Sequence, residues 1–304
     1  MDILVVGSVA LDTVETPFGK IEDGLGGSAT HFSASASFFV PLHLVAVVGE
    51  DFPQKHLDFL KSRNVSLEGL QKKSGKTFRW KGKYSFDLNS AQTLDTQLNV
   101  FQHFMPELPT DYRKKELIFL ANIDPELQSR VIDQCDNPKL IAMDTMNFWI
   151  EGKREALLKT LKRVHMLLIN EGEARQLAEE SNLVKAVRRI RAWGPKTVVI
   201  KRGEYGALLF HEHEIFSAPA LPLEDLKDPT GAGDSFAGGF LGYLAKNNLF
   251  TFEHLKKACI FGSVMASFNV EEFSCDRLRR LTNGEIEKRY RQFCDLTHFE
   301  TYPF

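Results

Sequence analysis

The chain has 304 residues, of which 43% are apolar and 26% charged, and its formal net charge is −2. This is the composition of an ordinary globular protein, and it excludes disordered, collagen-like and low-complexity classes. A near-neutral chain also gives no electrostatic reason to expect a nucleic acid or a membrane as partner. The four cysteines form no CxxC pair, so we expect reduced thiols, no zinc site and a cytoplasmic location.

Short apolar runs alternate with helical patterns along most of the chain. We expect buried strands at residues 2–7, 42–48, 117–121, 140–143, 166–169 and 198–201. We expect helices at residues 28–40, 52–63, 125–136, 151–163, 171–193, 231–246, 252–269 and 276–294. Residues 24–27 (GLGG) are expected to form a hinge, and residues 207–217 a hairpin. Strands that alternate with helices predict an α/β fold with a mostly parallel sheet covered on both faces.

Residues 75–104 differ from this pattern. Apolar and basic residues alternate over residues 77–84 (TFRWKGKY), which is typical of a half-exposed hairpin, and residues 94–104 are expected to continue it. Together with residues 12–24, this segment is expected to form a small β-sheet lid on one domain that spans residues 1–304. Its many aromatic side chains also favour a homodimer through the lid, because large apolar patches mark contacts.

The densest chemical signal is the segment 228–240 (DPTGAGDSFAGGF). Gly231 and Gly233 allow a ligand to approach the backbone closely, and a helix begins immediately after them. The unpaired amides of such a helix start bind phosphate without a lysine. Asp234 falls in the first turn of this helix, where an anion is favoured, so we expect it to be ionised at neutral pH.

This segment closely resembles the C-terminal signature D-T-x-G-A-G-D-x-F-x-x-G of the ribokinase-like (PfkB) carbohydrate kinases, with proline in second place. The resemblance implies a three-layer ribokinase-like sandwich and an ATP-dependent kinase. It also implies that Gly231, Ala232 and Gly233 form the anion hole for the transferred phosphoryl group and that Asp234 is the catalytic base.

Three further segments are similar to nucleotide-binding and cation-binding parts of that family. Asn170 and Glu173 match its N-x-x-E motif, and oxygen ligands at a strand end suit a hydrated Mg²⁺; the alternative is a capped helix with a solvated glutamate. Asp228 and Thr230 stand where many members bind a monovalent cation such as K⁺, which is a further expectation. Residues 198–207 (VVIKRGEYGA) resemble the nucleotide loop T-x-G-x-x-G or, alternatively, form a plain hairpin turn.

In that loop Gly203 and Gly206 match the glycines, and Lys201 stands where threonine is common. Gly262 lies in the predicted helix 252–269, which corresponds to the helix that the family packs beside adenine. Small residues there are equally consistent with close packing between helices. The resemblance therefore implies ATP contacts for Lys201, Gly203, Gly206 and Gly262, in addition to Asn170.

The substrate side of the resemblance lies near the start of the chain. Asp12 follows the first strand at the place of the aspartate that holds substrate hydroxyls, and Gly26 and Gly27 match the GG motif. His31 replaces the asparagine of GGxxxN, which argues against a simple ribose or fructose phosphate as acceptor. Asn147, in the segment 144–147 (DTMN), resembles the asparagine of a D-x-N segment with extra spacing.

We therefore expect γ-phosphate transfer to a hydroxyl of a small polyhydroxy molecule, with an unphosphorylated sugar or polyol favoured. A nucleoside whose base packs against lid aromatics is the alternative, and a sugar phosphate is disfavoured unless Arg79, Lys81 and Lys83 reach it. A non-catalytic sugar or nucleotide sensor remains a rival. An NAD-dependent dehydrogenase is only a remote alternative, because no GxGxxG motif follows the first strand.

Overall fold

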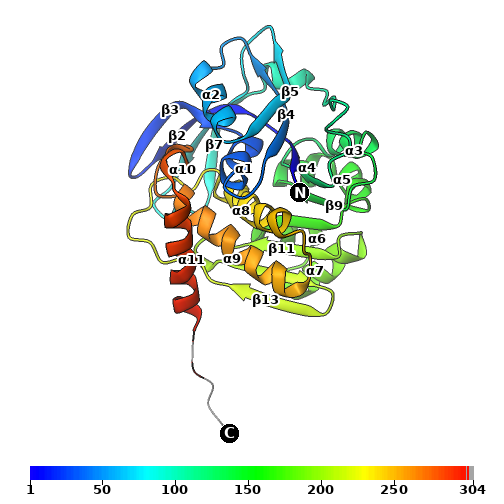
Figure 1. The fold of residues 1–304 in the computed structure, drawn as a ribbon, viewed down its shortest axis with the longest axis vertical. Helices are drawn as coiled ribbons and strands as arrows, with labels where there is room; N and C mark the ends of the chain where they lie inside the picture. Colours follow the sequence, from blue (N-terminus) through cyan, green and yellow to red (C-terminus); the bar gives the residue numbers. More distant parts are fainter. Residues whose placement is uncertain (299, 301–304) are drawn as a thin grey trace.

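The computed structural model describes residues 1–298 and 300, and its centre is a nine-stranded sheet (Figure 1). The strand order is β13-β12-β11-β10-β9-β8-β1-β4-β5, and all neighbours from β5 to β11 are parallel. The hairpin β12–β13 adds two antiparallel strands at one edge. The strands are β1 (Ile3–Val6), β4 (Leu42–Gly49), β5 (Val65–Lys73), β8 (Leu117–Leu120), β9 (Leu140–Asp144), β10 (Met166–Asn170), β11 (Thr197–Lys201), β12 (Ala207–His211) and β13 (Glu214–Ala218). The predicted α/β fold with a mostly parallel sheet is confirmed.

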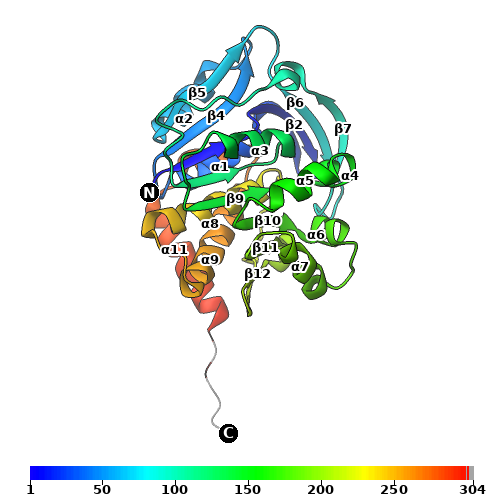
Figure 2. The same cartoon turned by 90° about the vertical axis from the view of Figure 1, so that its right-hand side faces the viewer.

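Helices cover both faces of this sheet, because its strands are apolar on both sides. Successive side chains of a strand point to opposite faces, so Ile3 and Val5 join one core while Leu4 and Val6 join the other. The first core is covered by α1 (Ser28–Ala36), α2 (Gln54–Ser62), α8 (Ala232–Asn247), α9 (Phe252–Asn269), α10 (Asp276–Arg280) and α11 (Asn283–Thr297). The second is covered by α3 (Pro125–Asp133), α4 (Asn147–Gly152), α5 (Arg154–Leu161), α6 (Glu171–Ala178) and α7 (Leu183–Ala192). Figure 2 shows α8 and α9 on one side of the strands and α6 and α7 on the other.

A second, four-stranded sheet has the order β3-β2-β6-β7, and we call it the small sheet (Figure 2). Its strands are β2 (Ala10–Thr16), β3 (Gly19–Gly26), β6 (Arg79–Tyr84) and β7 (Ala91–Gln97). β2 begins four residues after β1 ends, at the carboxyl edge of the central sheet. The expected hinge at residues 24–27 is wrong, because residues 24–26 pair with β2 as the end of β3.

Other differences from the predicted elements have local causes. Residues 94–104 are not one strand: β7 ends at Gln97, and a 3₁₀ helix, Asn99–His103, follows. The expected helices 151–163, 171–193 and 276–294 are each divided in two. At the second of these breaks Glu179 takes a left-handed conformation and Asn182 caps the next helix. The strand β5 is absent from the sequence prediction, because its polar residues give an edge strand no continuous apolar run.

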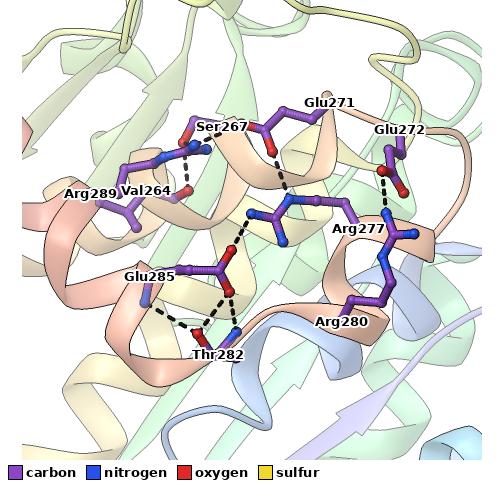
Figure 3. A network of polar contacts seen from close by, with 9 residues as sticks. All are labelled: Val264, Ser267, Glu271, Glu272, Arg277, Arg280, Thr282, Glu285 and Arg289. Atoms are coloured by element: carbon purple, nitrogen blue, oxygen red, sulfur yellow. Dashed lines mark hydrogen bonds and ion pairs between the residues drawn. The ribbon is translucent and has the colours of Figure 1, made fainter.

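A network of arginines and glutamates joins the three C-terminal helices (Figure 3). Arg277 on α10 donates to Glu271 at 2.8 Å and to Glu285 of α11 at 2.7 Å. Arg289 of α11 pairs with the other oxygen of Glu271 at 2.7 Å. This network holds the turn after α9, where the carbonyl of Val270 accepts the amide of Lys227 at 2.8 Å. The C-terminal helices thereby position the segment that leads into α8.

Two features are absent from residues 1–298 and 300, the part of the chain that the structure describes. No helix there combines the length and hydropathy needed to cross a membrane. The four cysteines, Cys135, Cys259, Cys275 and Cys294, form no disulfide within that part of the chain.

Candidate active site

Three neighbouring strands of the central sheet end on polar side chains: β9 on Asp144, β10 on Asn170 and β11 on Lys201. The Lys201 ammonium reaches across β10 and donates to Asp144 Oδ2 at 2.7 Å, and both side chains are largely buried. Burial alone lowers the pKa of Lys201, but the carboxylates of Asp144, Glu173 and Asp234 raise it above its ordinary value. Lys201 is therefore a fixed cation at the carboxyl edge of the sheet.

Asn170 and Glu173 hold each other at the start of α6. The Asn170 side chain accepts the amide of Glu173 at 2.8 Å, and the Glu173 carboxylate accepts the amide of Asn170 at 3.0 Å. This is a capping box, so the capped-helix alternative is also correct in its geometry. Burial and the nearby Asp144 raise the pKa of Glu173. The site thus gathers carboxylate and amide oxygens, the donor set that Mg²⁺ prefers.

Within the described residues, no three His, Cys, Asp or Glu side chains form a cluster that could hold a metal. A magnesium ion at Glu173 and Asn170 would consequently complete its shell with water and phosphate oxygens, as this ion commonly does. The metal role of these two residues stays a prediction.

The glycine loop before α8 has the shape that its sequence indicates. Gly231 has φ +75°, and a β-carbon there would overlap the ring of His31, so only glycine fits. Gly233 is helical, and a β-carbon there would lie 3.1 Å from Lys201 Nζ. The Ala232 amide donates to the carbonyl of Pro229 at 3.1 Å. The amides of Gly233 and Asp234 fall in the first turn, where a helix supplies no acceptor, so they are available to an anion.

The surroundings of Asp234 work against its ionisation. Burial and the nearby carboxylate of Asp144 raise the pKa of Asp234 to about 8, against the opposing charge of Lys201. Asp12 and Glu173 add to the negative field. Desolvation and neighbouring carboxylates therefore oppose the ionisation that the helix end favours, and an ionised Asp234 at neutral pH stays a prediction.

Asp12 from β2 and His31 from α1 line a pocket between the small sheet and the glycine loop. The other lining residues are Val14, Ile21, Gly24, Leu25, Asp228, Thr230 and Ser274. Burial raises the pKa of Asp12 to about 7, although the Gly27 amide that faces it acts in the opposite direction. A β-carbon at Gly26 would overlap the Asp12 carboxylate. The GG pair consequently leaves room for Asp12 and directs one amide to it.

Asp228 acts as an anchor of the glycine loop. One carboxylate oxygen accepts the amide of Thr230 at 2.9 Å, and the other accepts the amide of Ser274 at 3.2 Å. Both oxygens are thus engaged with the backbone, which accounts for an aspartate at this position without a cation. The monovalent cation at Asp228 and Thr230 stays a prediction.

The small sheet contributes two aromatic residues of the predicted lid segment, Trp80 and Tyr84. The Thr230 hydroxyl donates to Tyr84 Oη at 3.3 Å, and burial raises the pKa of Tyr84 to about 12. Trp80 is the register partner of Asp12 in the parallel pair β2–β6, so the two share a face of the sheet. Gly82 lies between Trp80 and Tyr84 and leaves space for the indole ring. The alternation of apolar and basic residues over 77–84 already indicated that these aromatic side chains share one face of a strand.

The basic residues of β6 occupy the opposite face of the small sheet. Arg79 pairs with Asp51 at 2.7 Å and with Asp23 at 3.1 Å. Lys83 pairs with Glu15 at 2.6 Å, and Lys81 is exposed. None of the three basic residues lines the pocket, so the suggestion that they reach a sugar phosphate is wrong for this arrangement.

Several expected contact residues have other roles in the structure. Asn147 is exposed at the start of α4 and does not line the pocket. Gly262 is buried where a β-carbon would meet Phe236 of α8 at 2.9 Å, so helix packing accounts for a glycine there, and its contact with adenine stays a prediction. Gly203 and Gly206 both have positive φ in the turn after β11, where Gly203 is exposed. Their contact with a nucleotide stays a prediction.

Comparison with known proteins places this geometry in a family context. The model of the pfkB family of carbohydrate kinases matches residues 2–279. The cytidine kinase of Thermococcus kodakarensis is 32% identical over 252 residues, which cover 80% of this chain and 88% of that protein. The nucleoside kinase of Burkholderia thailandensis, solved in complex with inosine, superposes with a TM-score of 0.77 at 18% identity over 95% of this chain and 97% of its own. The aminoimidazole riboside kinase of Salmonella enterica was solved in complex with aminoimidazole riboside and an ATP analogue. It superposes with a TM-score of 0.75 at 15% identity, and the match covers 95% of this chain and 100% of that one.

Proposed function

Because the chain belongs to the pfkB family of carbohydrate kinases and is thus a phosphotransferase with a hydroxyl acceptor, we propose that its acceptor is a nucleoside and its donor ATP. The similarity to a cytidine kinase at 32% identity supports a nucleoside more than the sugar or polyol that the sequence alone favoured. Side chains on the inner face of the small sheet also support the proposal.

The observation that carries the proposal is the inner face of the small sheet. Asp12 and Trp80 are register partners on the same face, and Tyr84 follows two positions beyond Gly82. A carboxylate binds sugar hydroxyls, whereas an aromatic ring stacks on a nucleobase with about 1–3 kcal/mol per base. A free sugar would need the first group but not the second. This combination of side chains suits a molecule with a polar ribose and a flat base.

The arrangement assigns a task to each part of the site. The amides of Gly233 and Asp234, at the start of α8, would stabilise the charge of the transferred phosphoryl group. Asp234, in its carboxylate form, would accept the proton of the attacking hydroxyl late in the reaction. Lys201, fixed by Asp144, would bind phosphate oxygens. Magnesium, when held at Glu173 and Asn170, would supply additional neutralisation of the phosphate charge.

Binding measurements test the acceptor class. Cytidine, adenosine, inosine, ribose and myo-inositol are titrated calorimetrically in the presence of a non-hydrolysable ATP analogue. We expect at least one nucleoside to bind at least tenfold more tightly than ribose, and Trp80→Leu to remove about tenfold of that affinity. Phe86→Leu is the matched control, because Phe86 is 84% exposed on the connection between β6 and β7. Tight binding of ribose or myo-inositol alone would restore the sugar or polyol acceptor.

A kinetic assay separates the enzyme from a sensor. With the best-binding acceptor and Mg-ATP, we expect stoichiometric formation of ADP and a phosphorylated acceptor. Binding without any phosphoryl transfer would favour the non-catalytic rival.

A further inference from the structure

A buried polar cluster lies behind the pocket, and its central residue is Asn269 at the end of α9. Asn269 is 1% exposed, His31 2% and Ser235 0%. The Asn269 side chain contacts three separate elements: the glycine loop through Thr230, α8 through Ser235 and α1 through His31. Its place in the sequence, at the last residue of a helix, gives no sign of this role.

The orientation of the Asn269 amide follows from its partners. Its Nδ2 lies 2.7 Å from the carbonyl oxygen of Thr230, which can only accept a hydrogen bond. The reversed amide would place two oxygens in contact, so the nitrogen must face Thr230. The Oδ1 atom therefore faces the Ser235 hydroxyl at 2.9 Å and the His31 ring at 3.0 Å.

This orientation decides which nitrogen of His31 carries the proton. Asn269 Oδ1 is only an acceptor, so the ring nitrogen beside it, Nδ1, must be the donor. The thiol of Cys275 lies 3.5 Å from the same nitrogen and is compatible as a second, weaker acceptor. Burial lowers the pKa of His31 to about 4, so the ring carries a single proton at neutral pH. Nε2 then has a lone pair and no hydrogen.

The Nε2 edge is the part of the ring left for the pocket. Nδ1 is turned toward Asn269, and Gly231 packs against the ring beside Cγ, Nδ1 and Cδ2. His31 nevertheless lines the pocket, together with the carboxylates of Asp12 and Asp228. Both oxygens of Asp228 already accept backbone amides. Nε2 is therefore an acceptor available to a ligand, beside the carboxylates of Asp12 and Asp228.

We propose that Asn269 is a positioning residue that locks His31 in the Nδ1–H form, so that Nε2 accepts a hydrogen bond from an acceptor-substrate hydroxyl. An asparagine at position 31 would offer either a donor or an acceptor, whereas this histidine offers only an acceptor. The ligand group opposite it must donate. The identity of that group as a ribose hydroxyl rests on the proposed function.

The state of the ring is tested on the wild-type protein without any substrate. Two-dimensional ¹⁵N–¹H NMR of imidazole-labelled protein distinguishes a protonated ring nitrogen from an unprotonated one. We expect Nδ1 to be protonated and Nε2 unprotonated, with no titration between pH 5.5 and 8. A protonated Nε2 in this range would overturn the proposal, whichever acceptor the enzyme uses. In Asn269→Leu we expect a mixture of both forms, while the surface change Asn247→Leu on α8 leaves the spectrum unchanged.

The consequence for specificity is tested by binding. The ribonucleoside that binds best is compared with its 2′- and 3′-deoxy and O-methyl analogues, each with a non-hydrolysable ATP analogue present. We expect at least one deoxy analogue and the matching O-methyl analogue to bind 100-fold or more weakly, because both leave Nε2 without a donor. In His31→Asn we expect the affinity for the O-methyl analogue to rise relative to the affinity for the deoxy analogue, because an amide can donate to the ether oxygen.

The two failures are distinguishable. Equal binding of the ribonucleoside and all its analogues would refute the role of His31 but leave the nucleoside kinase intact. Failure of every nucleoside to bind would refute the proposed function, while the NMR measurement would still decide the form of the ring.

Discussion

The substitution Gly231→Ala tests how tightly the glycine loop is built on the His31 ring. Gly231 has φ +75°, and a non-glycine residue in a left-handed conformation costs about 1–2 kcal/mol. Its β-carbon would also overlap the buried imidazole, and overpacking of this kind typically costs about 1–3 kcal/mol. The two effects predict a loss of about 2–5 kcal/mol in the free energy of unfolding.

Urea unfolding, followed by tryptophan fluorescence, measures this loss. Gly233→Ala is the matched control, because Gly233 has a helical backbone and its added β-carbon would lie 3.1 Å from Lys201 Nζ, which needs to shift by only a few tenths of an ångström within its ion pair with Asp144. We expect a change below about 1 kcal/mol for this control, since alanine also favours the helix by about that amount. The double change His31→Ala and Gly231→Ala should avoid the overlap while retaining the backbone cost. A Gly231→Ala midpoint equal to that of the control would refute the reasoning.

Four further predictions concern the catalytic base, the pH dependence of stability, the metal and assembly. Asp234→Asn should lower kcat about 100-fold with little change in nucleotide affinity; a retained kcat would exclude Asp234 as the base. The folded pKa of Asp234, about 8, lies above its ordinary value of 3.8, so the folded state keeps a proton that the unfolded chain loses. The free energy of unfolding should thus fall from pH 5 to pH 8, and calorimetry should show a smaller slope in Asp234→Asn. Glu173→Gln should raise the Mg²⁺ concentration needed for half-maximal activity; an unchanged requirement would leave it a capping residue. Sedimentation at micromolar concentration should show a homodimer through the small sheet, and a monomer would remove that prediction.

The amino-acid sequence determined the parts of this protein that depend on neighbours along the chain. Continuous apolar runs predicted the parallel strands, because a strand buried on both faces has no polar side. The segment 228–240 predicted a loop and helix start for an anion, because its geometry depends on glycines and on helix ends. The pattern of residues 77–84 likewise placed aromatic and basic side chains on opposite faces of a strand.

Only the tertiary structure decided which distant groups meet. The ion pair Lys201–Asp144 joins residues 57 positions apart, and the hydrogen bond Thr230–Tyr84 joins residues 146 apart. The His31–Asn269 contact spans 238 positions. Sequence spacing carries no information on such contacts, since they arise from the order of strands in the sheet and from the packing of helices on it. The raised pKa of Asp234 has the same origin, because the carboxylates around it come from separate strands and helices. The sequence thus determined the glycine loop and the helix start that follows it, and the fold decided the protonation and hydrogen-bonding properties of the groups around them.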